Sequence, residues 1–303
     1  MMMKSAALAA FAALGLTSAA TAAEGQTKEL KHVHESWAGI LGHYDQAQLQ
    51  RGYQVYRTVC ASCHSMDLVA FRHLGQKGGP FYLDRCPEGL GIPESTDCSN
   101  PVSNPIIKSL AKDYQFEDGP DDAGDMFMRA GLVSDYLPSP YANREQAQAA
   151  NGGAYPPDMS LLVKARHHGP AYIYSLITGY EEPPETISVP AGQHYNPYYP
   201  GDTKALLKPE YVDEEGHVKD GVELPPGGVF KMAAPLKDGV ISYEDGSPET
   251  VEQYAEDVVA FLQWAAEPKL EQRKSLGRAV LLYLLIFAGI VYFSYKQIWK
   301  KVH

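Results

Sequence analysis

The spacing of hydrophobic and polar positions predicts two amphipathic helices in the body of the chain. Between residues 45 and 59, apolar side chains recur at intervals of three and four, as on one face of a helix. A similar apolar face runs from Pro248 to about Ala266, and Pro268 ends it. Ser247 suits the N-cap of this second helix, and proline suits its first helical position.

The remaining pattern predicts short helices, long loops and few strands. Met159 to His168 and Ala171 to Gly179 are predicted as short helices separated by Gly169-Pro170. Residues 75–105 are rich in Gly, Pro and Ser, and residues 183–226 are mostly irregular. We therefore expect a mostly α-helical fold decorated by long loops.

The N-terminal residues 1–23 predict a secretory signal peptide. Lys4 precedes a run of Ala, Leu and Phe, and the stretch ends in the small residues Thr21-Ala22-Ala23, which are typical of a cleavage site. A first transmembrane helix is the alternative, but the apolar core is short for a span. The signal peptide predicts that the bulk of the chain is exported.

A second apolar segment, residues 276–295, predicts a transmembrane anchor. It holds one charge, Arg278, near its start. At about 1.5 Å per residue it covers most of a bilayer core of about 30 Å. A buried core helix is the alternative, but such a helix would not be followed only by lysines as charged residues. We expect an exported domain over residues 24–270 and a cytoplasmic tail over residues 296–303.

Charge is distributed unevenly between these parts. Residues 24–268 hold 18 Lys and Arg against 36 Asp and Glu, whereas residues 269–303 hold 7 against 1. A nucleic-acid partner is not expected, because the acidic domain would repel phosphates. The charge fits either a basic protein partner that is steered by the field or simply a soluble acidic surface.

The chemistry is carried by Cys60-Ala61-Ser62-Cys63-His64, a C-x-x-C-H motif. Two thiols at this spacing can reach the two vinyl groups of a haem, and the adjacent histidine then supplies one axial ligand. A zinc site would usually need a second Cys/His pair, and a thioredoxin-type motif would follow a strand. The sequence has neither feature, so one covalent haem c, attached outside the cytoplasm, is predicted.

The second axial ligand must come from far along the chain and from the opposite face of the ring. The methionines outside the predicted signal peptide are Met66, Met126, Met128, Met159 and Met232. Met66 is too close to His64 to cross the haem. Met232, in a loop rich in Gly and Pro, is the leading candidate, with Met159 second and the histidines at 167 and 168 as rivals. A thioether ligand would raise the reduction potential relative to two histidines.

Two cysteines remain, Cys86 and Cys98. In an oxidising compartment, two leftover cysteines usually pair. The loop between them is short, so a disulfide would contribute roughly 3 kcal/mol or less to stability. Two free thiols are the alternative.

Several sequence blocks, in order, resemble the cytochrome c1 family of bacterial type, the haem subunit of the ubiquinol–cytochrome c oxidoreductase (cytochrome bc1) complex. The blocks are RGYQVY (51–56), CASCHSM (60–66), FRHL (71–74), MFMR (126–129), AANGGAYPPD (149–158), KARHHG (164–169), LITGY (176–180), NPYYPG (196–201) and AFLQWAAEP (260–268). The resemblance runs from about Trp37 to the C-terminal span. It implies a cytochrome-c-like haem domain with long loop insertions, plus one C-terminal transmembrane helix.

The resemblance also implies roles for individual residues. His64 and Met232 match the axial ligands, and Arg166 matches an arginine near a haem propionate, a role that suits a guanidinium. Asn151, Pro157 and Tyr172 match residues of the haem pocket. Two segments depart from shorter family members, residues 202–224 and residues 77–105, which leaves their loop structure open.

By resemblance, the protein is an electron relay in the bacterial inner membrane, crossing once, with the haem domain in the periplasm. Its partners would be cytochrome b, a Rieske iron–sulfur protein, and a soluble basic or membrane-bound c-type cytochrome, in a dimeric complex. Electron transfer makes no bond in a substrate, so no catalytic nucleophile or general base is expected in this subunit.

Two alternatives belong to other functional classes. A stand-alone haem peroxidase would need an open iron position, and c-type peroxidases carry a second C-x-x-C-H, whereas this chain has one. A stand-alone, membrane-tethered electron carrier usually joins a short haem domain to a flexible linker. Here the linker between the domain and the predicted anchor, residues 268–277, is short and charged.

Overall fold

The computed structural model describes residues 26–300, and the predicted signal peptide lies outside the described residues. The helices are α1 (Gln46–Thr58), α2 (Phe71–Leu74), α3 (Pro105–Lys112), α4 (Arg144–Ala150), α5 (Gly169–Thr178), α6 (Val251–Ala266) and α7 (Leu270–Trp299), with short 3-10 helices at Cys60–Ser62, Lys204–Leu206 and Pro209–Tyr211. The strands are β1 (Gln115–Asp118), β2 (Phe127–Ala130), β3 (His194–Asn196) and β4 (Gly228–Phe230). They form two antiparallel pairs, β1–β2 and β3–β4. The expected mostly helical fold is confirmed.

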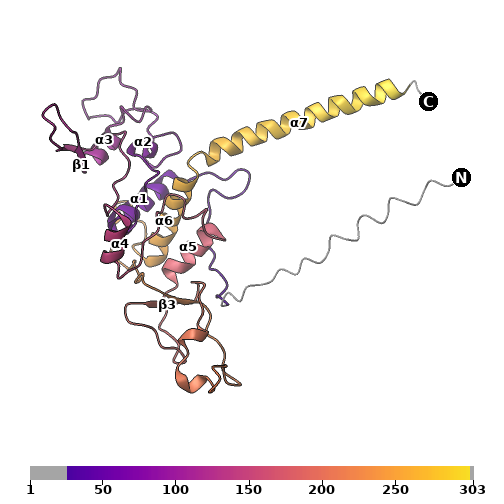
Figure 1. Ribbon diagram of the computed structural model, residues 1–303. Coiled ribbons are helices and arrows are strands. Elements are labelled where there is room, and N and C mark those ends of the chain that lie inside the picture. Colours follow the sequence, from indigo (N-terminus) through magenta and orange to yellow (C-terminus); the bar gives the residue numbers. More distant parts are fainter. Residues whose placement is uncertain (1–25, 301–303) are drawn as a thin grey trace.

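The core of the domain is the crossing of α1 and α6, onto which α5 packs (Figure 1). Asp45 caps α1 by accepting a hydrogen bond from the backbone N–H of Gln48 at 3.1 Å. The two helices approach closely at Gly52, where a Cβ atom would lie 2.0 Å from the carbonyl oxygen of Asp257. Only glycine fits such an approach, and this contact fixes where the C-terminal end of α1 points.

A buried charged group lies in the same crossing. The Asp257 side chain has no exposed surface, and its carboxylate accepts hydrogen bonds from Arg51 Nε at 3.0 Å and Arg51 Nη2 at 3.1 Å. The Tyr243 hydroxyl donates to it at 2.9 Å and Gln253 Nε2 at 3.1 Å. Because each oxygen of this carboxylate accepts two hydrogen bonds, the network satisfies a charge that would otherwise be costly to bury.

Helix α6 begins three residues later than predicted. Thr250, not Ser247, is its N-cap and accepts a hydrogen bond from the N–H of Gln253 at 3.3 Å. The Glu249 carboxylate instead binds the backbone N–H of Tyr243 at 3.0 Å, so the residues before the cap are held to the preceding loop. Because of this contact, Pro248 lies before the helix and does not mark its start.

The prediction of a helix over residues 159–168 is wrong. This segment is a series of turns, with hydrogen bonds such as Lys164 N–H to Leu161 carbonyl at 3.0 Å. It ends at His168, whose φ of 59° is left-handed and stops helical propagation. Gly169 and Pro170 do not separate two helices but form the first turn of α5, where proline is well accommodated.

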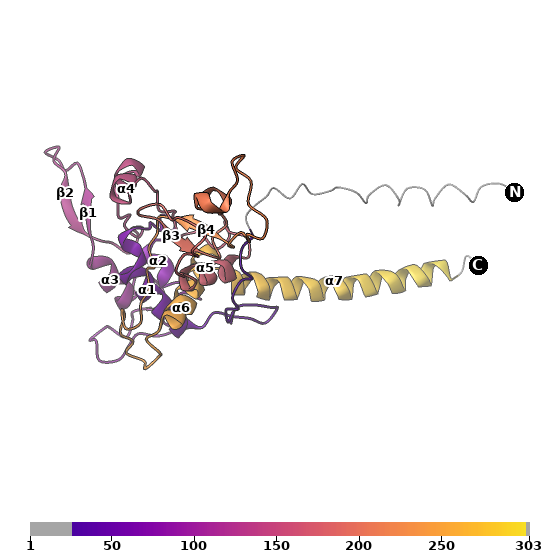
Figure 2. The ribbon, with the colours of Figure 1, turned by 90° about the horizontal axis from the view of Figure 1, so that it is seen from below.

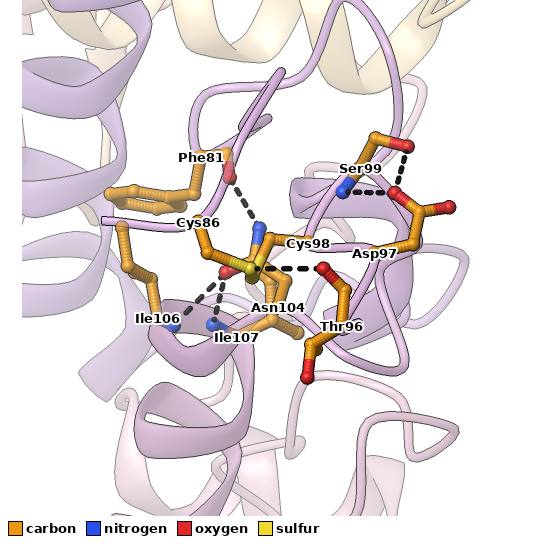
Figure 3. Close-up of a disulfide and its surroundings, with 9 residues drawn as sticks. All are labelled: Phe81, Cys86, Thr96, Asp97, Cys98, Ser99, Asn104, Ile106 and Ile107. Atoms are coloured by element: carbon orange, nitrogen blue, oxygen red, sulfur yellow. Dashed lines mark hydrogen bonds between the residues drawn. A yellow bond between two sulfur atoms is a disulfide. The ribbon is translucent and has the colours of Figure 1, made fainter. Parts of the chain in front are cut away.

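Two loop regions extend from this core. In residues 75–104, a disulfide joins Cys86 to Cys98, whose Cα atoms are 5.0 Å apart (Figure 3). Beside it, Asn104 caps α3 and also donates from Nδ2 to the carbonyl of Phe81 at 2.8 Å, which ties this loop to the core. Residues 202–224 form the lobe at the lower end of Figure 1, beyond β3.

Helix α7 extends away from the domain (Figures 1 and 2). Within residues 26–300 it is the one helix long and apolar enough to cross a membrane, with a mean hydropathy of 2.1 over its most apolar stretch. None of that stretch is buried inside the domain, which excludes the alternative of a core helix. The helix starts at Leu270, before the predicted anchor at 276, because the basic residues ahead of the apolar run are helical as well.

Candidate haem site

The C-x-x-C-H motif lies where α1 ends. Val59 ends the helix, and the chain tightens into a 3-10 turn in which the N–H of Cys63 donates to the Cys60 carbonyl at 3.1 Å. The N–H of His64 donates to the same carbonyl at 2.9 Å. Cys60 packs against the core, and burial raises the pKa of its thiol to about 12. Neither Cys60 nor Cys63 is in a disulfide. Both thiols therefore remain free for thioether bonds.

The His64 ring is oriented by a backbone carbonyl. His64 Nδ1 lies 2.9 Å from the carbonyl oxygen of Pro157. A carbonyl can only accept, so Nδ1 carries the proton and Nε2 keeps the lone pair that a metal needs. Burial lowers the pKa of His64, although the Pro157 carbonyl and the charge of Asp158 oppose this shift. The ring is thus held as a neutral ligand, which fits an iron on its Nε2 side.

Asp158 holds the segment that carries this carbonyl. Its Oδ2 accepts from the Ser65 hydroxyl at 2.9 Å and from the Asp67 N–H at 2.8 Å, and its Oδ1 accepts from the Ser160 N–H at 2.9 Å. The Met159 N–H also donates to the Ser65 carbonyl at 2.8 Å. Residues 157–160 are therefore joined to residues 64–68 by several hydrogen bonds, and Pro157 is fixed on the Nδ1 side of His64.

This geometry distinguishes the candidate methionines. Met159 lies in the segment that contacts the Nδ1 side of His64, and its side chain is buried in the core. The side chain of Met66 is also buried in the core. Met126 and Met128 are exposed at the β1–β2 hairpin. A second axial ligand must approach from the Nε2 side. Met232 is neither in the buried core nor in the hairpin but half-buried in a loop, and it remains the leading candidate among the described methionines.

The Met232 loop is positioned by its backbone. Strand β4 pairs with β3 just before it, with Tyr195 opposite Val229. The Tyr180 hydroxyl donates to the Met232 carbonyl at 3.0 Å, and the ring of Tyr180 packs on Phe230, with centroids 5.7 Å apart. Lys231 Nζ donates to the Gly152 carbonyl. The loop is thereby tied both to the end of α5 and to residues 151–153.

The other expected pocket residues have mixed positions. Arg166 is exposed, and its charge opposes the rise in the pKa of Tyr172 that burial causes. Asn151 ends α4, and its Nδ2 donates to the Ala147 carbonyl at 2.7 Å and to the Tyr141 hydroxyl at 3.0 Å. In the described residues, no hydrogen bond joins the Met232 loop to His64. The histidines at 167 and 168 are exposed and pack edge to face, with ring centroids 4.2 Å apart.

Three positioning residues were not predicted. Asp158 and Tyr180 lie in sequence blocks that resemble the family, and Lys231 precedes Met232, but nothing in local periodicity marks them. Their contacts bridge distant segments, as in the 52 residues between Tyr180 and Met232. The set of two thiols, a neutral imidazole and a thioether loop fits a c-type haem. In the part of the chain that is described, no cluster of His, Cys, Asp and Glu would suit another metal ion.

The sequence was also compared with known proteins. The model of the Cytochrome C1 family matches residues 36–302. A cytochrome c1 of Rhodospirillum rubrum is 42% identical over 301 residues, which cover 99% of this chain and 97% of that protein. A mitochondrial cytochrome c1 haem protein of Schizosaccharomyces pombe is 39% identical over 282 residues, which cover 92% of this chain and 76% of the relative.

A further relative is longer. A cytochrome b/c1 of Bradyrhizobium diazoefficiens is 40% identical over 287 residues, which cover 88% of this chain. The chain spans only 35% of that relative.

Proposed function

This chain belongs to the cytochrome c1 family, and from that premise we propose that it is the haem-bearing electron carrier of a bacterial cytochrome bc1 complex. It accepts one electron from a Rieske iron–sulfur protein and delivers it to a soluble or membrane-bound c-type cytochrome, next to a cytochrome b subunit in a dimeric complex. The observation that carries the proposal is the C-x-x-C-H motif at the end of α1, with His64 Nδ1 at 2.9 Å from the Pro157 carbonyl.

The chain's residues have distinct roles in this proposal. The haem, when bound, supplies a one-electron couple. Cys60 and Cys63 would hold it covalently, and His64 and Met232 would ligate its iron. Tyr180 and Lys231 fix the methionine loop through its backbone. Arg166 neutralises a propionate, and Asn151, Pro157 and Tyr172 line the pocket.

The proposed location is the bacterial inner membrane, crossed once by α7, with the haem domain in the periplasm. The apolar run of α7 and the predicted signal peptide at residues 1–23 support this orientation. An oxidising periplasm also suits the pairing of Cys86 with Cys98, which stabilises a loop that has little apolar content.

The junction between α6 and α7 argues against a carrier on a flexible tether. Residues 267–269 alone separate the two helices. The Tyr44 hydroxyl donates to the Glu267 carbonyl at 3.2 Å, and the Glu271 carboxylate accepts from the Tyr44 N–H at 2.8 Å. A domain pinned in this way stays close to the membrane, where it can meet other subunits of a complex.

Purification of the full chain from membranes in mild detergent tests the proposal. We expect the haem to remain attached to this chain after denaturation, and cytochrome b and iron–sulfur subunits to co-purify with it. A haem that dissociates on denaturation would contradict the covalent site. A chain that carries covalent haem but elutes alone would favour the stand-alone carrier.

A second expectation concerns ionic strength. Because the domain is strongly acidic, reduction of a basic c-type cytochrome should be fastest at low salt and should slow steeply as salt screens the steering field. Stopped-flow rates with a basic and an acidic cytochrome measure this, and the acidic cytochrome is the control. Rates with the basic cytochrome that do not depend on salt would show that the acidic surface serves solubility only.

A further inference from the structure

An exposed apolar loop lies beside the first turns of α7. In Figures 1 and 2, a dark indigo loop projects from the domain in the same direction as this helix. This loop consists of residues 37–43, which are joined to α7 by hydrogen bonds. At its tip, Ile40 and Leu41 are 73% and 78% exposed, although both are large aliphatic side chains. Two adjacent exposed aliphatic side chains of this kind are typical of a surface that contacts an apolar partner, such as a protein or a membrane.

The loop is a defined structure that is fixed at its base. The N–H of His43 donates to the Ser36 carbonyl at 3.1 Å and closes the loop, while Trp37 and Tyr44 are buried beneath it. A Cβ atom at Gly42 would lie 2.0 Å from the Ala38 carbonyl oxygen, so the return of the chain requires glycine. The backbone of the loop therefore holds the tip in a defined position.

Three side chains of α7 bind this loop. Glu271 accepts from the Tyr44 N–H at 2.8 Å, Lys274 donates to the carbonyls of Trp37 and Gly42, and Arg278 Nη1 donates to the Ile40 carbonyl at 2.8 Å. Positions 271, 274 and 278 lie on one face of a helix. The loop thus runs along that face, and its tip reaches the level of Arg278.

That level is where the apolar part of α7 begins. Residues 279–295 carry no charge and span about 25 Å, close to the thickness of a hydrocarbon core. The cations at positions 269, 273, 274 and 278 precede it and suit the phosphates of a lipid surface. Between Glu35 and Asp45, the loop itself holds no acidic or basic group other than His43.

We propose that Ile40 and Leu41 insert into the interfacial layer of the bilayer, as a second membrane contact beside α7. This inference rests on the proposed membrane anchor. A single helix leaves a domain free to tilt, whereas a helix and an adjacent inserted loop define a plane. The contact would therefore set the orientation of the haem domain relative to the membrane surface.

Spin labelling of the full haem protein tests this contact. Leu41→Cys carries a nitroxide in vesicles of phosphatidylcholine with phosphatidylglycerol, and collision with oxygen is compared with collision with a water-soluble nickel chelate. Leu285→Cys, in the middle of α7, is the lipid reference. Met128→Cys, on the hairpin at the opposite end of the domain from α7 in Figure 2, is the water reference. Ile40→Cys gives a second probe, and the haem absorption spectrum checks folding.

We expect the ratio of oxygen to nickel accessibility at Leu41 to be several-fold higher than at Met128 and lower than at Leu285, because the interfacial layer is shallower than the middle of the bilayer. A ratio at Leu41 equal to that at Met128, with Leu285 still in lipid, would overturn the loop contact and leave the anchor intact. A water-exposed label at Leu285 would instead overturn the anchor. If the Leu41 label is water-exposed in the isolated subunit and shielded from both reagents in the assembled complex, its partner is a protein surface and the lipid contact is wrong.

Discussion

Replacing Met232 with leucine is expected to lower the reduction potential by an amount on the order of hundreds of millivolts, within the roughly 0.8 V range that axial ligands cover. Leucine keeps the volume of the side chain but has no lone pair for iron. The loop should stay in place, because its contacts to Tyr180 and Gly152 involve the Met232 carbonyl and Lys231, not the thioether. Potentiometric titration of the holoprotein measures the change. The reduced variant should also bind carbon monoxide, which the wild-type protein should exclude.

Met159→Leu is the matched control, because Met159 was the second candidate for the ligand. Its segment lies on the Nδ1 side of His64, so this variant should keep the wild-type potential and should not bind carbon monoxide. If Met159→Leu lowers the potential and Met232→Leu does not, the assignment of the ligand is wrong. Wild-type protein that already binds carbon monoxide would favour a haem enzyme.

Replacing Asp257 with alanine is expected to lower the free energy of unfolding by roughly 3–5 kcal/mol. The variant leaves the largely buried Arg51 guanidinium without its main partner and removes the acceptor of the Tyr243 hydroxyl. Burial raises the pKa of Tyr243, so at neutral pH this hydroxyl does not become an anion that could pair with Arg51. Guanidinium unfolding of the full haem protein in detergent, followed by circular dichroism, measures the loss.

Asp245→Ala is the control, since Asp245 accepts from the same arginine. Arg51 Nη1 lies 2.8 Å from Asp245 Oδ2, but the Asp245 side chain is 45% exposed. Exposed ion pairs contribute about 0–1 kcal/mol, so this change should shift the unfolding midpoint little. Equal losses for the two variants would show that the burial of Asp257 does not decide the strength of its interaction.

Local signals were sufficient where an element depends on its own residues. The predicted helix over residues 45–59 matches α1, because its periodicity and the cap at Asp45 both lie within one short segment. The predicted start of α6 was wrong, because Glu249 binds the loop at Tyr243, which no local pattern indicates. Residues 159–168 have helical spacing but form turns, since their backbone is fixed to residues 65–68 by distant hydrogen bonds.

The amino-acid sequence alone was enough to predict the covalent haem motif, an apolar C-terminal segment, an acidic domain and a family resemblance, because these are properties of composition and short spacing. The folded chain was needed to show which carbonyl orients His64, across 93 residues. It also placed the loop of residues 37–43 against α7, more than two hundred residues later. Contacts of this kind depend on long-range packing of buried groups, which a linear pattern does not encode residue by residue.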